Sequence, residues 1–259
     1  MTPDQERQRE HFNSIADRYH AARRGANHQL LKRLMWARFF RKINLRLPDT
    51  ARVLEPMCGF ADGLDILTEH MPGQKIEYQG YDYSERMVEK VQTLRPGVVV
   101  WQADATTYQP PAEYDLVILL GALHHVYANV DAAARNICHA VKPGGYLINL
   151  EPTHGNPLTK AIRDRIYRKN ELFDHQTEQA FGVGELESLF MSNGMKQEAA
   201  MYPGLLSYIL YYNPDAFPGL NIGGHRMVRA TFCLDQLAMH NVAGRALSFA
   251  TLSLWQKPL

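Results

Sequence analysis

The chain has 259 residues, of which 46% are hydrophobic and 21% charged, with a formal net charge of +1. This length and composition predict one globular domain with an insertion, and the near-neutral charge argues against a nucleic-acid partner covering the whole surface. No apolar run approaches the roughly 18 residues of a membrane span, and the first residues lack a signal-peptide core, so we expect no stable membrane insertion and a cytoplasmic protein. Cys58, Cys138 and Cys233 are too few and too scattered to predict disulfides or a zinc cluster.

The N-terminal segment, residues 1–47, is predicted to be helical in at least two pieces that break near Gly25. Between Arg23 and Arg46 it carries eight Lys or Arg and no acid, beside an apolar stripe of Leu31, Met35, Phe39 and Ile43. Such a helix can lie on a membrane surface. We favour the simpler alternative, in which the stripe faces the core and the basic face is solvated.

Residues 53–63, VLEPMCGFADG, indicate a strand end, an acidic residue and a loop of small residues that opens a helix. Such a loop lets the backbone approach a ligand closely, and the acid Glu55 can hold a polar or cationic part of it. A second strand at 76–81 ends at Asp82, which stands where a dinucleotide-type fold places its ribose-binding acid.

Further strands and turns follow with similar spacing. A strand at 98–102 precedes Asp104 and Ala105, and the apolar run 115–120, typical of a buried parallel strand, precedes Gly121. Residues 142–145 predict a turn that leads into a strand at 146–150. The alternation of strands and helices predicts a parallel sheet.

These motifs together resemble the class I S-adenosylmethionine-dependent methyltransferases, and in particular the small-molecule enzymes of the ubiquinone and menaquinone biosynthesis type. The resemblance implies an α/β fold with a Rossmann-like, doubly wound, mostly parallel seven-stranded sheet, an N-terminal helical cap and a C-terminal helical insertion. It divides the single domain 1–259 into the cap, a core at 51–201, an insertion at 202–246 and a final strand at 247–259. Met57 and Ala61 stand where the family's loop has its first and third glycines, and Gly63 lies two residues beyond the pattern.

The resemblance also implies the cofactor, S-adenosyl-L-methionine, and the residues that hold it. Phe12, Ala16 and Tyr19 match a cap segment whose tyrosine can touch the methionine end of the cofactor, although Tyr19 can equally pack on the core. Arg23 or Arg24 could pair with the cofactor's carboxylate. The expected cofactor-binding residues are Tyr19, Arg24, Glu55, Met57, Gly59, Ala61, Asp82, Tyr83, Met87, Asp104, Ala105 and Gly121.

The C-terminal third is the most individual part of the chain. Helices are predicted near 158–170 and 184–193, and strands at 195–201 and 247–255. The long insertion 202–246 separates these two strands and is rich in Tyr, Phe and Met. We expect a helical lid over the acceptor site; a dimerisation patch or a simply packed extension remain as alternatives.

His124 and His125, directly after the fourth strand, are the candidate catalytic residues because histidine can accept a hydroxyl proton near neutral pH. The expected substrate-binding residues are Glu151, His154, Asn156, Tyr202 and Tyr208. We expect no metal, since the His pair lacks the i, i+4 spacing of zinc proteases.

The resemblance implies methyl transfer to a small-molecule acceptor, most commonly an oxygen. One alternative keeps the cofactor but cyclises or cleaves its methionine chain, releasing methylthioadenosine. Another is a non-catalytic regulatory protein that binds the cofactor. A homodimer is possible, and a nucleic-acid partner is not expected.

Overall fold

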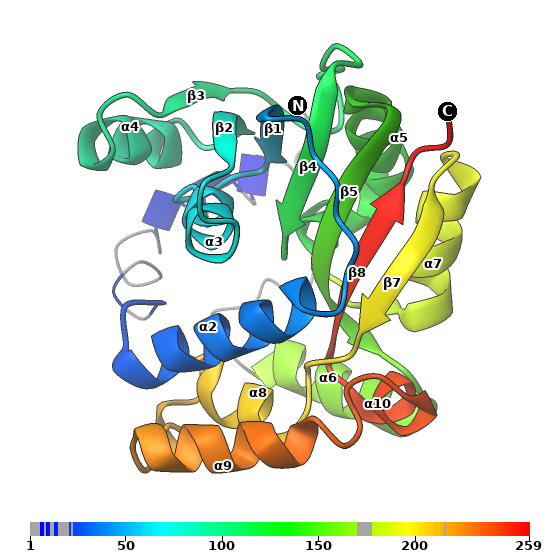
Figure 1. The fold of residues 1–259 in the computed structure, drawn as a ribbon. Helices are drawn as coiled ribbons and strands as arrows, with labels where there is room; N and C mark the ends of the chain where they lie inside the picture. Colours follow the sequence, from blue (N-terminus) through cyan, green and yellow to red (C-terminus); the bar gives the residue numbers. More distant parts are fainter. Residues whose placement is uncertain are drawn as a thin grey trace.

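Figure 1 shows the fold in a computed structural model, which describes residues 6–7, 9–10, 13–14, 21, 23–169, 178–214 and 216–259. Among these residues the sheet has eight strands, seven of which follow the order β3-β2-β1-β4-β5-β8-β7. β1 to β5 pair in parallel, while β8 is antiparallel to both β5 and β7. These seven strands are β1 (Thr50–Pro56), β2 (Lys75–Asp82), β3 (Val99–Gln102), β4 (Tyr114–Leu120), β5 (Val141–His154), β7 (Lys196–Met201) and β8 (Ala250–Gln256). The predicted doubly wound, mostly parallel sheet is therefore confirmed.

Helices pack on both faces of this sheet because successive apolar side chains of each strand point to opposite faces. Val53 and Ile118 belong to one core cluster with α3 and α4, whereas Leu54 and Leu119 belong to a second cluster with α5 and α7. The helices of the two layers are α3 (Asp62–His70), α4 (Glu85–Leu94), α5 (Val130–Ala140) and α7 (Val183–Ser192). The crossover rule for parallel strands accounts for this arrangement.

Two details differ from the sequence prediction. The predicted turn at 142–145 lies inside β5, where the register jumps from Tyr114↔Val141 to Leu116↔Tyr146, so these residues bulge out of the ladder. An additional strand, β6 (Phe181–Gly182), pairs with the end of β5.

The helix predicted near 158–170 is α6 (Pro157–Lys169). Among the residues described, no helix combines the length and apolar character needed to cross a membrane.

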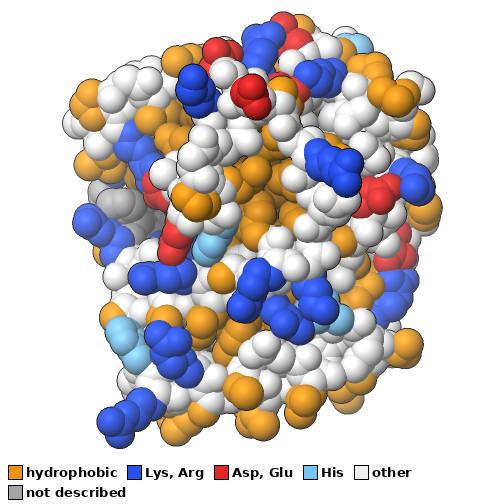
Figure 2. Space-filling model, in the orientation of Figure 1, with side chains coloured by type: hydrophobic (Ala, Val, Ile, Leu, Met, Phe, Trp, Pro, Cys, Tyr) orange, Lys and Arg blue, Asp and Glu red, His pale blue; other side chains and the backbone are white. Residues whose placement is uncertain are grey.

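α2 (Ala26–Phe40) crosses the carboxyl edge of the parallel strands (Figure 1). It begins after Gly25, where the break was predicted, and its stripe of Leu31, Met35 and Phe39 is buried in the main core. Figure 2 shows Lys and Arg side chains spread over the face where α2 lies. The apolar stripe therefore faces the core as predicted. Of the basic residues, Arg33, Arg41, Lys42 and Arg46 are exposed as expected, whereas Lys32 is only partly exposed and pairs with Asp62.

The insertion folds into short helices, two of which pack against α2. They are α8 (Leu206–Tyr211), η2 (Pro218–Leu220), α9 (His225–Asp235) and α10 (Val242–Leu247). α8 and α9 contact each other and α2 (Figure 1). Asp235 ties α9 to the start of α8, since its carboxylate accepts hydrogen bonds from the backbone N–H groups of Leu206 (3.0 Å) and Ser207 (2.7 Å). The predicted final strand began too early: Leu247 ends α10, and β8 starts at Ala250.

Candidate functional site

The loop after β1 has an unusual backbone. Met57, Gly59 and Ala61 all adopt positive φ angles, of 51°, 50° and 59°. These are the three positions at which the family's loop carries glycine, and the left-handed conformation costs an ordinary residue roughly 1–2 kcal/mol. The chain therefore keeps the glycine-type conformation without two of the glycines.

Glu55 lies beneath this loop and fixes its far end. Its carboxylate accepts hydrogen bonds from the Gly63 N–H at 3.1 and 3.0 Å and from the Tyr78 hydroxyl at 2.6 Å. A Cβ atom on Gly63 would lie 2.5 Å from Glu55 Oε2. Gly63, which the sequence pattern left unexplained, is thus needed for the close approach of this carboxylate. Burial raises the pKa of Glu55 to about 8.

Asp82, at the end of β2, holds the middle of the same loop. Its Oδ2 accepts a hydrogen bond from the Gly59 N–H at 3.0 Å, and its Oδ1 accepts one from the Ser84 N–H at 2.9 Å. Burial raises the pKa of the Asp82 carboxyl, and these hydrogen bonds oppose that rise. The strand end that the sequence assigned to ribose binding is therefore joined directly to the loop.

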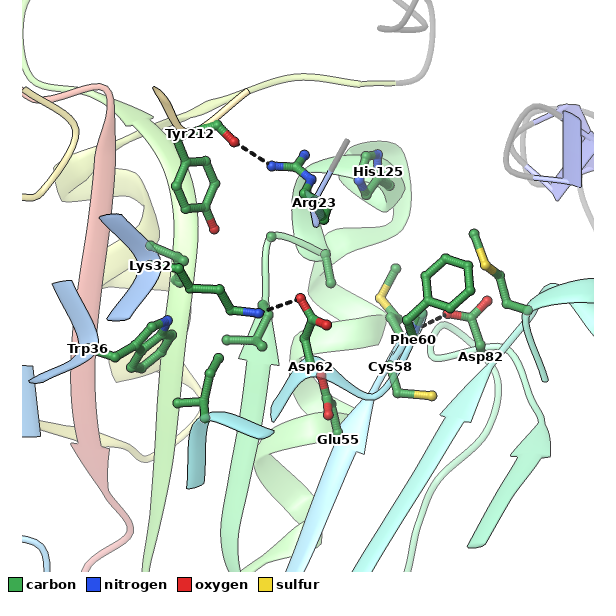
Figure 3. A pocket seen from close by; sticks show the side chains of 18 of the residues that line it. Arg23, Lys32, Trp36, Glu55, Cys58, Phe60, Asp62, Asp82, His125 and Tyr212 are labelled. Atoms are coloured by element: carbon green, nitrogen blue, oxygen red, sulfur yellow. Dashed lines mark hydrogen bonds and ion pairs between the residues drawn. The ribbon is translucent and has the colours of Figure 1, made fainter. Parts of the chain in front are cut away.

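A pocket opens between this loop, the carboxyl edge of the sheet and α2 (Figure 3). Nine of the residues singled out in the sequence line it: Arg23, Glu55, Met57, Gly59, Asp82, Tyr83, Met87, Gly121 and His125. Sequence reasoning missed the remaining lining residues: His28, Lys32, Trp36, Cys58, Phe60, Asp62, Ile66, Leu120, Ala122, Leu150 and Tyr212.

The missed residues come mostly from α2 and its neighbours, which form the wall opposite the loop. Lys32 reaches from α2 to Asp62 at the start of α3, with Nζ 2.6 Å from Oδ2 (Figure 3). Arg23 donates a hydrogen bond to the Tyr212 carbonyl at 2.7 Å, and Nδ1 of His28 lies 2.8 Å from the same oxygen. Burial lowers the pKa of His28 to about 3, so this imidazole is neutral. The basic residues at 23–46 do not predict this wall from sequence, because Tyr212, the partner of Arg23 and His28, lies almost two hundred residues further along the chain.

The two candidate catalytic histidines have different surroundings. His124 is buried, and its Nδ1 lies 2.9 Å from Glu151 Oε2. Burial, followed by the neighbouring His125, lowers the pKa of His124. His125 instead lines the pocket, and its Nδ1 lies 3.2 Å from Glu178 Oε1. The structure thus separates a buried histidine from one that faces the pocket.

His124, His125 and Glu178 have donor atoms within 4.8 Å of one another, close enough for a cation to be considered. However, the centroids of the two imidazole rings lie 3.8 Å apart with their planes tilted by 40°. The Nδ1 atom of each ring already lies beside a carboxylate of its own, Glu151 for His124 and Glu178 for His125. The geometry fits two histidine–carboxylate pairs better than a shared metal.

The residues expected to bind substrate lie outside the lining of this pocket. Glu151 is fully buried and its Oε1 accepts hydrogen bonds from the Ala122 and Leu123 N–H groups, both at 2.8 Å. It thereby holds the start of η1 (Leu123–Asn129), which carries both histidines. Asn156 caps α6 through a hydrogen bond from Thr159 N–H at 2.9 Å.

The other three are placed further along the chain. His154 ends β5 opposite Gly182 of β6, and burial lowers its pKa. Tyr202 accepts a hydrogen bond from Arg245 at 3.1 Å. Tyr208 stacks on Tyr212 with ring centroids 4.2 Å apart, so it supports a side chain of the pocket wall.

Four expected cofactor residues are also outside the lining. The Asp104 carboxylate accepts hydrogen bonds from the backbone and hydroxyl of Thr106, both at 2.8 Å, and Ala105 is buried in the second core cluster. Ala61 is buried in the main core. Arg24 is exposed in the turn before α2. Tyr19, together with the cap segment around it, lies outside the described residues.

The chain is similar in sequence to a methyltransferase family and in fold to solved methyltransferases and a cyclase. Residues 53–145 match the family described as a methyltransferase domain. An S-adenosylmethionine-dependent methyltransferase of Thermotoga maritima is 16% identical, with a TM-score of 0.60 over 96% of this chain and 99% of that one. One from Mesorhizobium loti is 18% identical, with a TM-score of 0.52 over 85% and 95%. The cyclase SpnF is 16% identical, with a TM-score of 0.57 over 86% and 81%, so the fold also occurs with a different activity.

Proposed function

We propose that this chain, whose residues 53–145 form a methyltransferase domain of the class I, S-adenosylmethionine-dependent type, transfers the methyl group of that cofactor to a separate small molecule. The observation that carries this proposal is the junction of the β1 loop with Asp82 at the carboxyl edge of a parallel sheet. Open α/β sheets bind their ligands at this edge. The family resemblance and the pocket geometry point to the same place.

The cofactor fits the end of the pocket beside the loop. Asp82 presents a buried carboxylate suited to the ribose hydroxyls. Met57, Gly59 and Gly121 line the same end of the pocket. Tyr83 and Met87 line the adjacent wall, where an adenine would lie near Asp104 and Ala105. Glu55 acts on the cofactor through the loop that it anchors.

The acceptor fits the end beside α2. Trp36, Ile66 and Leu150 offer apolar surface there, and Lys32 and Arg23 stand at its edge (Figure 3). A pocket bounded by a helix on one side and a sheet edge on the other suits a small molecule better than a protein or nucleic-acid segment. This supports a small-molecule acceptor.

The cofactor supplies a methyl group on a sulfonium, already activated for in-line attack. The protein's task is to hold the acceptor oxygen in line and to exclude water, and such positioning can supply on the order of 7–11 kcal/mol. For a hydroxyl acceptor, His125 takes the proton as the new carbon–oxygen bond forms and the carbon–sulfur bond breaks toward sulfur. His124 keeps a supporting role, since it is buried beside Glu151.

A second candidate retains the cofactor but acts on its methionine chain. One observation favours this candidate, namely the positive φ angles at Met57 and Ala61 in the loop beside the methionine end. The similarity of fold to a [4+2]-cyclase supports only that this fold also serves reactions other than methyl transfer. An intramolecular reaction would need no acceptor and would release methylthioadenosine. The nucleoside product therefore separates the two candidates.

The acceptor can be sought with a labelled methyl group. Purified protein is incubated with S-adenosylmethionine carrying a ¹³C-methyl group and with a small-metabolite extract, and new labelled products are sought by mass spectrometry. We expect one labelled product that forms in step with S-adenosylhomocysteine. With the cofactor held near its wild-type Kd, an Asp82→Ala variant that folds normally should form much less of both. Label found only in methylthioadenosine, with no methylated acceptor, would contradict the proposal.

A further inference from the structure

Glu178 was not singled out by the sequence, yet it faces the histidine that lines the pocket. We propose that Glu178 is a positioning residue that holds His125 in the tautomer with its proton on Nδ1, leaving Nε2 to take the acceptor's proton. The inference rests on the proposed methyl transfer for its purpose. Its geometry does not depend on that function.

The first support is the contact itself. Nδ1 of His125 lies 3.2 Å from Oε1 of Glu178, and the Glu178 side chain is 1% exposed while that of His125 is 17% exposed. The contact has the distance of an ion pair but not the alignment of a hydrogen bond. The negative charge of the carboxylate still favours a proton on the facing nitrogen. The imidazole's other nitrogen is then the basic one. The buried acid thus orients the accessible base.

The second support is how Glu178 is fixed. The N–H of the next residue, Gln179, donates a hydrogen bond to the His124 carbonyl at 3.2 Å. β6 begins shortly afterwards and pairs in parallel with the end of β5. Glu178 is therefore attached by backbone bonds to both the histidine turn and the sheet. This is the rigid support that an orienting carboxylate requires.

The third support is that each histidine has its own carboxylate, Glu151 for His124 and Glu178 for His125. Glu151 serves His124 and also holds η1 through the Ala122 and Leu123 N–H groups, so it is not available to His125. The ring centroids lie only 3.8 Å apart, which disfavours positive charge on both rings at once. Besides Glu178, His124 and Asp82 also act electrostatically with His125. Only Glu178 among these carboxylates contacts its Nδ1 at ion-pair distance in the residues described.

The direct test is the tautomer of His125, which needs no acceptor. Protein with ¹⁵N-labelled histidine is bound to S-adenosylhomocysteine, and long-range ¹H–¹⁵N spectra are recorded at a pH where the ring is neutral. The signals of His125 are identified by their loss in His125→Asn. We expect a protonated Nδ1 and a bare Nε2 in the wild-type protein.

Substitutions then isolate the role of the carboxylate. Glu178→Gln can offer its amide N–H to Nδ1, so it should move the ring toward the opposite tautomer, whereas Glu178→Asp should retain part of the original signal. Glu185→Gln is the matched control: its carboxylate is in the same region but accepts from Gly182 N–H and the Tyr127 hydroxyl, and it should leave His125 unchanged. With an acceptor in hand, Glu178→Gln should lower kcat roughly 10- to 100-fold with little change in the KM of the cofactor.

Two results would overturn the proposal. One is a wild-type ring with its proton on Nε2, or the same spectrum in Glu178→Gln as in wild type. The other is displacement of the Nδ1 proton by added Zn²⁺ at stoichiometric concentration, which would make the cluster a metal site. Because the spectra need only the protein and the cofactor product, failure here is distinct from failure to find a methylated acceptor.

Discussion

The backbone N–H of Gly59 donates a hydrogen bond to Oδ2 of Asp82 at 3.0 Å, which joins the loop after β1 to the end of β2. The same carboxylate accepts from Ser84 through its other oxygen. Asp82 therefore has two tasks: it shapes the loop, and it presents negative charge to the pocket. Its replacement should affect ligand binding and local order together.

Replacing Asp82 by Ala should weaken cofactor binding. Hydrogen bonds to a charged group contribute roughly 1.5–3 kcal/mol, which corresponds to a rise of about 10- to 150-fold in Kd. Calorimetric titration with S-adenosylhomocysteine measures this, with the exposed Glu89→Ala as control. Unchanged affinity in a folded Asp82→Ala protein would remove Asp82 from the cofactor site.

Met57 offers a test of the strained loop. At an ordinary position Ala is more stable than Gly by roughly 0.5–1 kcal/mol. Because φ of Met57 is 51°, we expect the order to reverse, with Met57→Gly unfolding at higher urea concentration than Met57→Ala. The same pair of substitutions at Thr68, on the exposed face of α3, should show the ordinary order. If Met57→Gly unfolds at the same urea concentration as Met57→Ala, or at a lower one, the loop relaxes from its positive φ angle in solution.

Gly63 should not tolerate a methyl group. A Cβ there would lie 2.5 Å from Glu55 Oε2 and 2.8 Å from Ile118 Cγ2, both buried, so Gly63→Ala should cost about 1–3 kcal/mol of unfolding free energy. Gly184→Ala is the matched control, since that helical glycine has open space around it and should gain up to about 1 kcal/mol. Chemical denaturation of the two variants gives the comparison, and a neutral Gly63→Ala would mean that Glu55 can move aside.

The buried Glu55 should make stability depend on pH. Its pKa rises from 4.5 to about 8 on folding, so between these values the folded protein holds a proton that the unfolded chain has lost. The free energy of unfolding should therefore fall as pH rises through this window. Glu55→Gln should flatten that slope, whereas Glu89→Gln on the exposed face of α4 should not. A wild-type stability that rises from pH 5 to pH 8 in urea titrations, with no change of slope in Glu55→Gln, would exclude a buried neutral carboxyl.

The side of the pocket formed by the loop after β1 could be predicted from sequence because its residues lie close together along the chain. A strand end, a small-residue loop and a second strand end place Glu55, Gly59 and Asp82 at one sheet edge, and the periodic apolar runs predict the strands that carry them. The side formed by α2, where we propose that the acceptor binds, could not be predicted. Lys32, Trp36 and Tyr212 meet only after α2 and the insertion pack together, and no local pattern encodes that contact.

The sequence also does not show whether a polar side chain binds a ligand or a backbone group of the fold. Glu151 and Asn156 looked like ligands for a polar substrate, but both satisfy backbone N–H groups in the fold. Polar side chains at strand ends and helix starts often serve these groups, and sequence alone does not distinguish the two uses. Glu178 was missed for the opposite reason, since it belongs to no motif and acquires its partner through β6.

The wall formed by α2 should respond to ligand. We expect bound S-adenosylhomocysteine to slow amide exchange in α2 and in residues 206–212, because Lys32, Trp36 and Tyr212 line the pocket. α10, none of whose residues line the pocket, is the internal control. Hydrogen exchange with mass spectrometry measures both. Protection confined to the loop and β2 would mean that α2 and the insertion are only packed structure.

The nucleoside left after turnover tests the central claim most directly. Purified protein is incubated with S-adenosylmethionine alone and, in parallel, with a small-metabolite extract, and the nucleosides are separated by liquid chromatography with mass detection. Methyl transfer predicts an intact cofactor in the first sample and S-adenosylhomocysteine in the second. Asp82→Ala should form much less S-adenosylhomocysteine when the cofactor is held near its wild-type Kd. Accumulation of methylthioadenosine from the cofactor alone, abolished by the same substitution, would contradict methyl transfer to a separate molecule.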